Sequence, residues 1–470
     1  MQEKCGVVGI AHADTPVARS LYDALYALQH RGQEAAGIVT HDGFQQHQHV
    51  EVGLVGDAFD ERDLESLQGR AGIGHVRYPT QGSLERSCAQ PFSISFKGGA
   101  LGLSHNGNLV NTAECRDALA DAGHTFTSTG DSEVIAHELA HQLLEHDVVE
   151  AVRQLMDRVH GSYSLTIMYD DEVMGVRDPL GNRPLCIGKV DDGYILASES
   201  SAIDTLGGEL VRDVRPGELV RLARDGSGYT SDQIVEVDHP AHCFFEYVYF
   251  ARPDSTMEGH LVYEIRRELG RQLWQESGIE TDVVIPVPDS GRAFASGYAE
   301  ASTGVEFAEG LMKNRYVGRT FIMPTQDERE RAVRAKLNPI RSTIEGKTVT
   351  LIDDSIVRGT TSKQLVKLLR AAGAREVHLR IGSPPIRAPC YMGIDMATRE
   401  ELIAHDRSVG EIETAIDADS LAYLSREAIA ETLEVTFDDL CMACVTGEYP
   451  YDIEGEETDR HISSRVARTP

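Results

Sequence analysis

Cys5 has the most readily defined chemistry in this chain, because it follows a leader of only four residues, 1–4, and opens the apolar run CGVVGI. If the leader is removed, Cys5 carries a nucleophilic thiol and a free α-amino group. The ordinary pKa of that amine, about 7.7–8.0, suits it as a general base near neutral pH. Such a pair can accept the acyl group of an amide. An isolated cysteine near a terminus is more often a buried strand residue, so the interpretation depends on the rest of the chain.

A second chemical pattern lies at residues 349–362, VTLIDDSIVRGTTS. An apolar strand ends there in Asp353 and Asp354, and a turn through Gly359 leads into a helix. The free N–H groups of a helix N-terminus, with the neighbouring hydroxyls, can hold a phosphate. The two carboxylates can bind ribose hydroxyls and help to hold a magnesium ion that neutralises a diphosphate. An Asp-Asp pair alone is usually a solvated turn, but its place between a strand and a phosphate cradle favours function.

Four glycine-containing runs in the first part of the chain carry side chains suited to an amino-acid substrate. Arg77 can bind an α-carboxylate and Asp131 an α-ammonium group. The side-chain amide of Asn106 and the backbone N–H of Gly107 can form an oxyanion hole for a tetrahedral intermediate. Each run alone could be an ordinary turn, since Asn-Gly is common in hairpins. The runs are QHRGQE at 29–34, GHVRYPT at 74–80, HNGN at 105–108 and GDSE at 130–133.

The eight cysteines favour free thiols or metal ligands over disulfides, because the chain does not begin with an apolar signal segment. Four of them lie in the second half, and their number and softness fit either zinc or an iron–sulfur cluster. The alternative is four unrelated thiols. These four are Cys243, Cys390, Cys441 and Cys444, whereas Cys88, Cys115 and Cys186 are expected to be ordinary core or surface residues.

Two further patterns have competing interpretations. The basic stretch 313–341 is either a charged surface helix or, in an otherwise acidic chain, a mobile lid over a polyanionic ligand, which we favour. The run HELAH at 137–141 matches the H-E-x-x-H of zinc metalloproteases. It lacks an obvious third ligand and continues the helix that opens at 130–133, so a protease is the weaker hypothesis.

Composition sets the class of protein. The chain has 470 residues, 41% of them hydrophobic, and 75 acidic against 45 basic residues give a net charge of -30. This charge argues against a nucleic-acid surface and suggests adaptation to salt. No run of 18 apolar residues exists, so membrane insertion is not expected and the cytoplasm is the expected location.

The order of predicted elements changes near residue 238. Short β-segments before it are interrupted by helices at 16–29 and 131–145, which is typical of packed antiparallel sheets with helices outside. After it, helices at 258–277, 291–302 and 361–372 alternate with strands at 282–285, 348–352 and 376–381, which predicts a parallel sheet. Residues 451–470 are expected to form a flexible acidic tail.

Two families account for these patterns together. With Cys5, the four glycine-containing runs resemble the glutaminase domain of class II, N-terminal-nucleophile amidotransferases. Residues 349–362 resemble the phosphoribosyl pyrophosphate signature of type I phosphoribosyltransferases. In this order they resemble the amidophosphoribosyltransferase family, of the short-leader iron–sulfur type, over residues 5–450. The resemblance implies a propeptide at 1–4, an αββα glutaminase domain at 5–237 and an α/β phosphoribosyltransferase domain with a parallel sheet at 238–450.

The resemblance also implies a reaction and its residues. Cys5 attacks glutamine, and the released ammonia, sheltered from protonation in an apolar passage, displaces pyrophosphate from phosphoribosyl pyrophosphate to give 5-phosphoribosylamine, the first committed step of purine biosynthesis. The implied oxyanion hole is Asn106 and Gly107, and the glutamine-binding residues are Arg31, Arg77, Thr80 and Asp131. The phosphoribosyl residues are Asp353, Asp354, Ser355, Arg358, Gly359, Thr360, Thr361 and Ser362, with lid residues Lys313, Arg315, Tyr316 and Lys336.

Cofactors and partners follow from the same resemblance. Ser290, Asp353 and Asp354 are expected to bind Mg²⁺, and the four cysteines of the second half a structural 4Fe-4S cluster. Purine nucleoside monophosphates are expected inhibitors and a homotetramer the expected assembly. A ligand-sensing regulator without catalysis is the remaining alternative, because a retained leader would deny Cys5 its free amine. The net charge weighs against a DNA-binding regulator, and the glutaminase runs weigh against a pure sensor.

Overall fold

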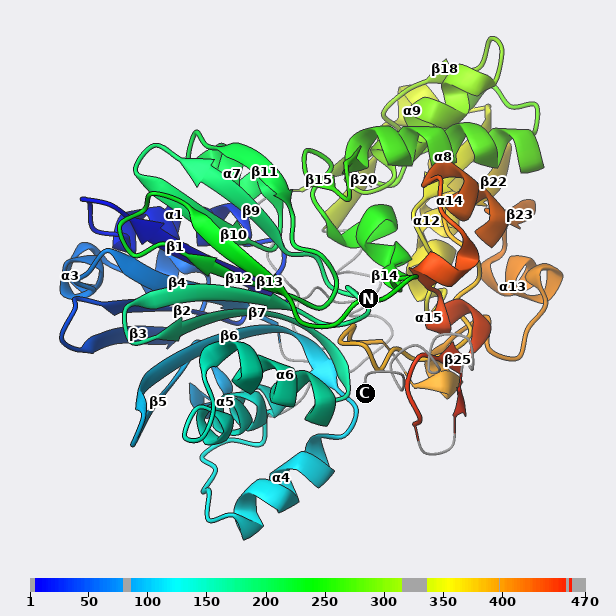
Figure 1. Cartoon of the computed structure of the whole chain (residues 1–470). Coiled ribbons are helices and arrows are strands. Elements are labelled where there is room, and N and C mark those ends of the chain that lie inside the picture. The colour runs from blue at the N-terminus through cyan, green and yellow to red at the C-terminus, as the bar shows by residue number, and fades with distance from the viewer. Residues whose placement is uncertain (1–4, 79–85, 315–335, 397, 454–455, 459–470) are drawn as a thin grey trace.

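The structure of the chain is a computed structural model that describes residues 5–78, 86–314, 336–396, 398–453 and 456–458 (Figure 1). The expected propeptide, residues 1–4, lies outside this range. No helix within these ranges combines the length and apolar character needed to cross a lipid bilayer.

Two antiparallel sheets face each other in the first part of the chain (Figure 1). A seven-stranded sheet has the order β11-β9-β10-β1-β4-β2-β3, and a six-stranded sheet has the order β13-β12-β8-β7-β6-β5. The strands of the first are β1 (Gly6–His12), β2 (Ala35–His41), β3 (Gln46–Val52), β4 (Ala71–Arg77), β9 (Cys186–Val190), β10 (Gly193–Ala197) and β11 (Glu209–Asp213). Those of the second are β5 (Phe92–Phe96), β6 (Gly99–Leu109), β7 (Gly161–Tyr169), β8 (Glu172–Arg177), β12 (Glu218–Leu222) and β13 (Tyr229–Gln233).

Helices cover the outer faces of both sheets, which gives the expected four-layer αββα order. A core shared by the two sheets includes Val7, Ile73 and Met168, all fully buried. Outside the first sheet, Leu25 packs closely on Gly74 of β4, a contact that only the missing side chain allows. The covering helices are α1 (Ala18–Ala27) and α7 (Ser200–Thr205) on the first sheet and α5 (Asp131–Gln142) and α6 (Val148–Arg158) on the second, with α4 (Thr112–Asp121) packed against α5.

The second part of the chain contains a five-stranded parallel sheet of order β18-β17-β21-β22-β23. The α/β prediction is confirmed. The strands are β17 (Val283–Pro286), β18 (Glu306–Phe307), β21 (Thr348–Asp353), β22 (Glu376–Ile381) and β23 (Ser420–Tyr423), and the main helices are α8 (Val262–Ser277), α9 (Arg292–Ala301), α12 (Thr360–Ala371), α13 (Val409–Ile416) and α14 (Arg426–Thr432).

One helix boundary differs from the expectation. The helix expected at 258–277 begins at Val262, because β15 (Thr256–Met257) and β16 (His260–Leu261) form a small antiparallel hairpin before it. Gly259, with φ of +80°, makes the turn of that hairpin. The helical periodicity of the sequence did not distinguish the hairpin from a first helical turn.

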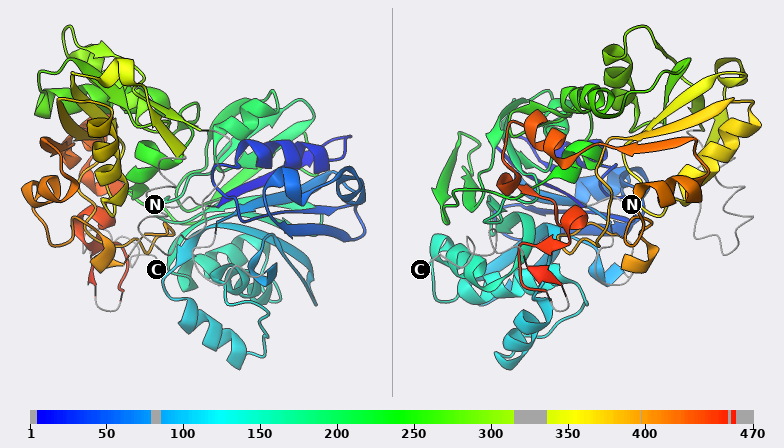
Figure 2. Two further views of the ribbon diagram at one scale, coloured as in Figure 1. Left: turned by 180° about the vertical axis from the view of Figure 1, so that it is seen from behind. Right: turned by 90° about the vertical axis from the view of Figure 1, so that its right-hand side faces the viewer.

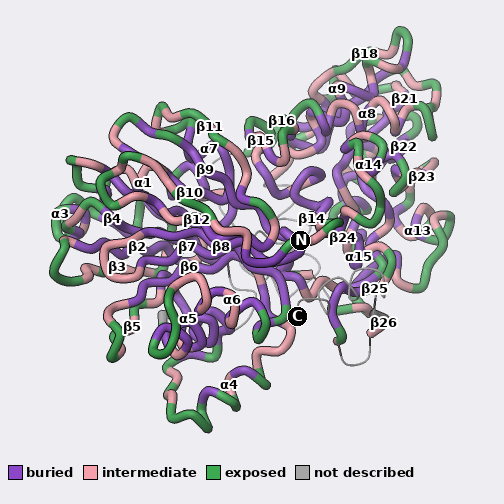
Figure 3. Tube along the Cα trace, viewed as in Figure 1, coloured by how far each residue is buried: buried purple, intermediate pink, exposed green. Residues whose placement is uncertain are grey.

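The two parts lie side by side and share buried residues (Figures 2 and 3). One core cluster combines Leu180 of the first part with Met392 and Cys441 of the second. Tyr451, at the start of the expected flexible tail, is only 6% exposed, and β26 (Glu457–Thr458) pairs with β25 (Glu448–Tyr449). The described residues of that tail therefore belong to the fold, since the aromatic ring is buried in this shared core.

Candidate active site

Cys5 lies directly before β1, at the end of the central strand pair of the first sheet. The antiparallel register of β1 and β4 sets Gly6 opposite Val76, so Cys5 reaches the segment that carries Arg77. The Cys5 Sγ donates a hydrogen bond to the backbone carbonyl of Tyr78 at 3.4 Å. Burial raises the pKa of the Cys5 thiol, although nearby arginines oppose this effect. A base at the site must therefore accept the thiol proton before the sulfur can attack.

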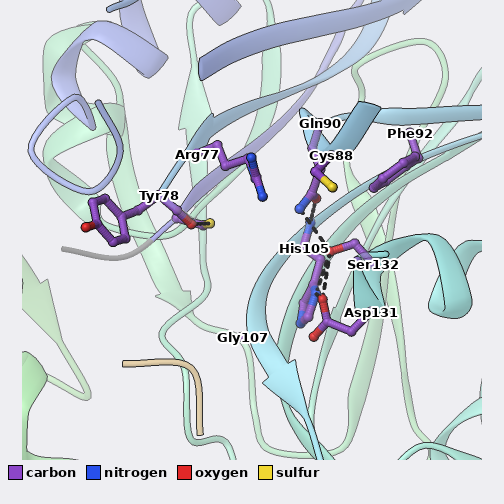
Figure 4. Close-up of a pocket in the computed structure, with 11 residues that line it drawn as sticks. Arg77, Tyr78, Cys88, Gln90, Phe92, His105, Gly107, Asp131 and Ser132 are labelled. Atoms are coloured by element: carbon purple, nitrogen blue, oxygen red, sulfur yellow. Dashed lines mark hydrogen bonds and ion pairs between the residues drawn. The ribbon is translucent and has the colours of Figure 1, made fainter. Parts of the chain in front are cut away.

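Cys5, Arg77, Gly107 and Asp131 line one cavity with about 320 Å³ of empty space (Figure 4). These residues come from four different elements, namely the start of β1, the ends of β4 and β6, and the first turn of α5. The structure thus brings together the nucleophile and three of the residues expected to bind or activate an amino-acid amide. The other residues that line the cavity are Tyr78, Cys88, Gln90, Phe92, His105, Gly130 and Ser132.

The expected oxyanion-hole residues are neighbours in β6. Asn106 is 1% exposed, and its side-chain Nδ2 has no hydrogen-bond partner among the described residues. A buried amide donor without a partner costs about 1–3 kcal/mol, so its retention fits a ligand atom that accepts from it. Gly107 has φ of +155°, and a Cβ there would lie 1.9 Å from the carbonyl oxygen of Ser162. The backbone at this position therefore requires glycine.

A hydrogen-bond network fixes the first turn of α5 beside the cavity. Asp131 Oδ2 accepts from the backbone N–H of Leu109 at 2.9 Å. The Gln90 side chain accepts from the N–H of His105 at 2.8 Å and donates to Ser132 Oγ at 2.9 Å. Burial lowers the pKa of His105, which favours the neutral ring. Sequence reasoning assigned no role to Gln90, His105 or Ser132, although His105 and Ser132 stood in two of the recognised runs.

Arg31 is placed differently from the glutamine-binding role expected of it. Its guanidinium is 1% exposed and pairs with Glu199 and Glu246, the latter at 2.8 Å, while its Nε donates to the carbonyl oxygen of Cys5 at 3.1 Å. Burial opposes the charge, but Glu246 and Glu199 together raise the pKa of Arg31. Arg31 therefore does not line the cavity, and it holds the backbone of the nucleophile instead.

Two other expectations concern this cavity. Thr80, an expected glutamine-binding residue, lies outside the described residues. Cys88 was expected to be an ordinary core or surface residue, yet its 3% exposed side chain lines the same cavity as Cys5.

The acidic pair lies at the carboxyl end of β21, where loops from neighbouring strands meet. Asp353 and Asp354 are 8% and 5% exposed, and the N–H of Gly382, which follows β22, donates to the Asp353 carbonyl at 2.9 Å. The loop after β17 comes equally close, because a Cβ on Gly291 would lie 2.5 Å from the carbonyl of Ile352. This contact brings the loop of Ser290 to the same edge of the sheet.

Burial, and then the neighbouring charge of Asp354, raise the pKa of Asp353 well above its usual range. A carboxylate in this state favours a proton or a cation close to it. Arg266, missed by the sequence analysis, is a buried cation near Asp354, and burial lowers its pKa to about 10. Its guanidinium donates to the carbonyls of Tyr247 and Ala251 at 2.7 and 2.8 Å.

The turn after the acidic pair has the form of a phosphate cradle. Gly359 caps α12 with φ of +72°, and a Cβ there would lie 2.3 Å from the side chain of Ile403. Thr360, Thr361 and Ser362 form the first turn of α12, where backbone N–H groups are free to bind an anion. Ser355 donates to Asp354, and the exposed Arg358 pairs with Glu401 at 2.8 Å.

The expected lid is described only at its two ends. Lys313 closes β19 (Leu311–Lys313), and its Nζ lies 2.9 Å from Asp289. Lys336 directly precedes β20 (Leu337–Pro339), which pairs with β19. Arg315 and Tyr316 lie outside the described residues.

The four cysteines of the second half converge. Cys243 of β14 (His242–Cys243) stands opposite Cys441 of β24 (Leu440–Cys441) in a parallel pair. Burial, and then the nearby Cys390, Cys243 and Cys441, raise the pKa of Cys444 well above its usual range. All four are free thiols. Within the described ranges no group of three His, Cys, Asp or Glu side chains is already arranged to hold a metal ion, but the donor set itself fits a thiolate-bound group.

The HELAH run does not resemble a metalloprotease site in the structure. Glu138 is buried. Its carboxylate accepts a hydrogen bond from the Gln142 side chain at 2.7 Å and forms an ion pair with Arg158 at 3.4 Å. His137 and His141 both contact His124, at 3.2 and 3.3 Å, through its two different ring nitrogens. One ion could not bind all three rings in this arrangement.

Comparisons with known proteins agree over the whole chain. Residues 77–205 match a family model described as a glutamine amidotransferase domain. An amidophosphoribosyltransferase of Methanothermobacter thermautotrophicus is 50% identical over 100% of this chain and 99% of its own length. One from Archaeoglobus fulgidus is 49% identical over 97% of this chain and 100% of its own length.

A solved structure extends the agreement to three dimensions. A glutamine phosphoribosylpyrophosphate amidotransferase from B. subtilis, in complex with ADP and GMP, is 42% identical and superimposes with a TM-score of 0.89. The match covers 97% of this chain and 100% of that one. Both halves of the molecule are thus matched in one continuous relative.

Proposed function

Because the chain belongs to the amidophosphoribosyltransferase family, we propose which of its residues carry out each half of the reaction. The enzyme transfers the amide nitrogen of glutamine to phosphoribosyl pyrophosphate, the first committed step of purine biosynthesis. We propose domain limits at 5–237 and 238–450, since the two large antiparallel sheets end with β13 at Gln233 and the five-stranded parallel sheet begins at Val283.

In the first half-reaction, Cys5 Sγ attacks the side-chain amide of glutamine and ammonia leaves as a thioester forms. The α-amino group released by removal of residues 1–4 takes the thiol proton and passes it to the leaving nitrogen. Asn106 Nδ2 and the N–H of Gly107 donate to the oxyanion. Arg77 binds the α-carboxylate and Asp131 the α-ammonium. Water then hydrolyses the thioester to glutamate.

The observation that carries this proposal is the cavity that Cys5 shares with Arg77, Gly107 and Asp131. Asn106, next to Gly107 in β6, keeps a buried Nδ2 donor that has no hydrogen-bond partner among the described residues. In this cavity, the positive charge of Arg77 matches the α-carboxylate of an amino acid, and the negative charge of Asp131 matches its α-ammonium group. Arg31 acts here as a positioning residue through the carbonyl of Cys5.

In the second half-reaction, ammonia attacks the anomeric carbon and pyrophosphate leaves, giving 5-phosphoribosylamine. The turn 358–362 holds the 5-phosphate at the N-terminus of α12, and Asp353 and Asp354 bind the ribose hydroxyls. Lys313 and Lys336 flank the stretch proposed as the lid. Only neutral ammonia is nucleophilic, so an apolar route between the two sites would favour the transfer.

Two resident groups are part of the proposal. Ser290, Asp353 and Asp354 would hold Mg²⁺, which when bound neutralises the diphosphate of the leaving group. The raised pKa of Asp353 is consistent with a cation at this pair. Cys243, Cys390, Cys441 and Cys444 would hold a 4Fe-4S cluster, which supplies structural cross-linking between β14, β24 and the segment at 390.

Regulation and assembly complete the proposal. Purine nucleoside monophosphates share the ribose 5-phosphate of the substrate, so they are expected to compete at or beside the 358–362 turn. The B. subtilis relative was solved with ADP and GMP bound, which supports nucleotide inhibition. A homotetramer is the proposed assembly, to be measured by light scattering.

The test is an assay of pyrophosphate release with glutamine or ammonium as nitrogen donor, on protein whose iron content has been measured. We expect both donors to support release, about four iron atoms per chain, and a mature chain that begins at Cys5 by mass spectrometry. Release with ammonium but not glutamine from chains beginning at Cys5 would contradict the assignment of the first site. The absence of release with either donor would contradict that of the second.

A further inference from the structure

A short backbone segment of the second part, residues 390–393, packs directly against the strand that carries the oxyanion hole. Asn108 Nδ2, in β6, donates to the carbonyl of Tyr391 at 2.9 Å. Ser162 Oγ, opposite Asn108 in β7, donates to the carbonyl of Met392 at 2.7 Å. Met392 and Ser162 are 2% and 0% exposed. The segment therefore forms a dry, hydrogen-bonded contact with the edge of the first site.

Gly393 makes the closest approach of this segment. Its φ is +88°, and a Cβ there would lie 2.7 Å from the carbonyl carbon and 2.9 Å from the carbonyl oxygen of Gly107. Real Cβ atoms do not tolerate such distances to backbone, so any side chain would push the two segments apart. Gly107 cannot give way, because its own Cβ position is filled by the carbonyl of Ser162. The peptide of Gly107 thus lies between Ser162 on one side and Gly393 on the other.

The same segment is joined to the backbone of the nucleophile through buried charges. Arg183, 0% exposed, donates to the carbonyl of Met392 through Nε at 3.0 Å and through a second guanidinium nitrogen. Its other nitrogen lies 3.3 Å from Glu246, whose carboxylate also pairs with Arg31. Arg31 in turn donates to the carbonyl of Cys5. Glu246, acting through Arg31 on Cys5, and Gly393, in contact with Gly107, are residues of the second part that therefore hold two residues lining the cavity.

We propose that Gly393 is a positioning residue for the amide-splitting site: by packing against the Cα and carbonyl group of Gly107, it restrains this residue, and so the direction of its oxyanion-hole N–H, from the other half of the chain. This inference rests on the proposed role of Gly107. It means that the first site is complete only when residues 390–393 are docked on β6. An oxyanion donor works through its alignment with a charge that develops in the transition state, so a small displacement lowers the rate more than substrate binding.

The direct test is Gly393→Ala in the full-length enzyme, with Gly304→Ala as the matched control. Gly304 has a similar φ of +97° but nothing within 4 Å of its Cβ position, so it reproduces the backbone cost without the contact. For Gly393→Ala we expect kcat for glutamine hydrolysis to fall by about 10- to 100-fold, with KM for glutamine within about twofold. Ammonia-dependent pyrophosphate release and the Tm should stay close to those of the control. An unchanged kcat, or an equal loss with ammonia, would overturn the proposal.

A milder variant keeps the proposal testable if Gly393→Ala does not fold. Ser162→Ala removes one donor to Met392 while Arg183 remains, so we expect glutamine kcat to fall about 3- to 10-fold without a change in KM. Labelling of Cys5 by an electrophilic glutamine analogue should slow by the same factor in each variant. Normal labelling and normal kcat in Ser162→Ala would overturn the positioning role. Failure of the proposed function itself would differ, because the wild-type enzyme would then hydrolyse no glutamine.

Discussion

The charged groups at the two sites of this enzyme are arranged in opposite ways. Around Cys5, the charged groups that hold the backbone are buried and already paired, as in Arg31 with Glu199 and Glu246. At the end of β21, Asp353 and Asp354 lie side by side, and burial together with the charge of Asp354 raises the pKa of Asp353 well above its usual range. In the ranges that the structure describes, the nearest buried cation, Arg266, donates to carbonyls rather than to these acids.

The difference follows from the substrates. Glutamine carries one charge of each sign and reacts at a neutral amide, so its site needs fixed dipoles and a held sulfur. Phosphoribosyl pyrophosphate is a polyanion, and the proposed Mg²⁺ would offset the charge of the two carboxylates, so the acidic pair is unfavourable without that cation. The first site is therefore assembled by folding, and the second is completed by its ligands.

The largest expected effect comes from removing the sulfur of the assembled site. Cys5→Ala should lower glutamine-dependent pyrophosphate release by at least about 10³-fold, because the acyl acceptor is lost. Release with ammonium should stay within about twofold of wild type, since the second site keeps all its groups. Parallel assays with the two nitrogen donors measure both. An equal loss of activity with both nitrogen donors would contradict the assignment of the two half-reactions to two separate sites.

The converse change acts on the ligand-completed site. Asp354→Ala should lower phosphoribosylamine formation with either nitrogen donor by about 100-fold, because a ribose and cation ligand is removed. Basal glutamine hydrolysis should persist, measured as glutamate without phosphoribosyl pyrophosphate. Asp406→Ala, at an 87% exposed aspartate that is not among the proposed substrate-binding residues, is the control. Loss of basal hydrolysis in Asp354→Ala alone would mean that the two sites do not fold independently.

A stability measurement tests whether the acidic pair is strained before ligands bind. The pKa of Asp353 is raised in the fold, so above the ordinary value of about 4 the folded state holds a proton that the unfolded chain releases. Stability then falls as pH rises through that window. In metal-free buffer, Asp353→Asn should melt about 2–4 °C above wild type at pH 8, and the two should converge near pH 4. Calorimetry measures both.

A control separates this effect from the general loss of a negative charge. The pKa of Asp225 is lowered by hydrogen bonds from Ser227, so Asp225→Asn should not raise the Tm at pH 8. If both variants showed the same increase in Tm over wild type, the change in net charge, and not the acidic pair, would be the cause of that increase. Added Mg²⁺ should raise the wild-type Tm more than that of Asp353→Asn.

The sequence indicated the residues that the structure gathers at the two sites better than the residues that hold them in place. Cys5, Asn106, Gly107 and the turn at 353–362 stand in local runs whose chemistry depends on near neighbours, and the fold class followed from the change in element pattern near residue 238. Gln90 and Gly393 could not be found in this way, and the place of Ser132 in the run at 130–133 did not reveal its role. Their roles come from contacts with residues distant in the chain, such as that of Gly393 with Gly107.

Arg31 illustrates the same limit. The family resemblance implied a glutamine-binding role for it, but its partners in the fold, Glu199 and Glu246, are separated from it by 168 and 215 residues. The hairpin at 256–261 was missed for a local reason, since its residues continue a helical pattern. The contacts of Arg31 required the tertiary structure, whereas the hairpin required only the turn at Gly259.

The smallest expected effect concerns the whole surface and distinguishes exposed from buried charge. With 75 acidic and 45 basic residues, the folded chain repels itself, and salt shortens the screening length from about 10 Å at 0.1 M to about 3 Å at 1 M. Salt also weakens exposed pairs such as Arg358 with Glu401, but each is worth only about 0–1 kcal/mol. Relief of repulsion should dominate, because the buried pairs of Arg31 are screened little.

We expect the Tm to rise by about 5 °C between 0.1 and 2 M KCl. This rise should exceed the rise in a sucrose solution of equal osmolality. An unchanged Tm would refute salt adaptation.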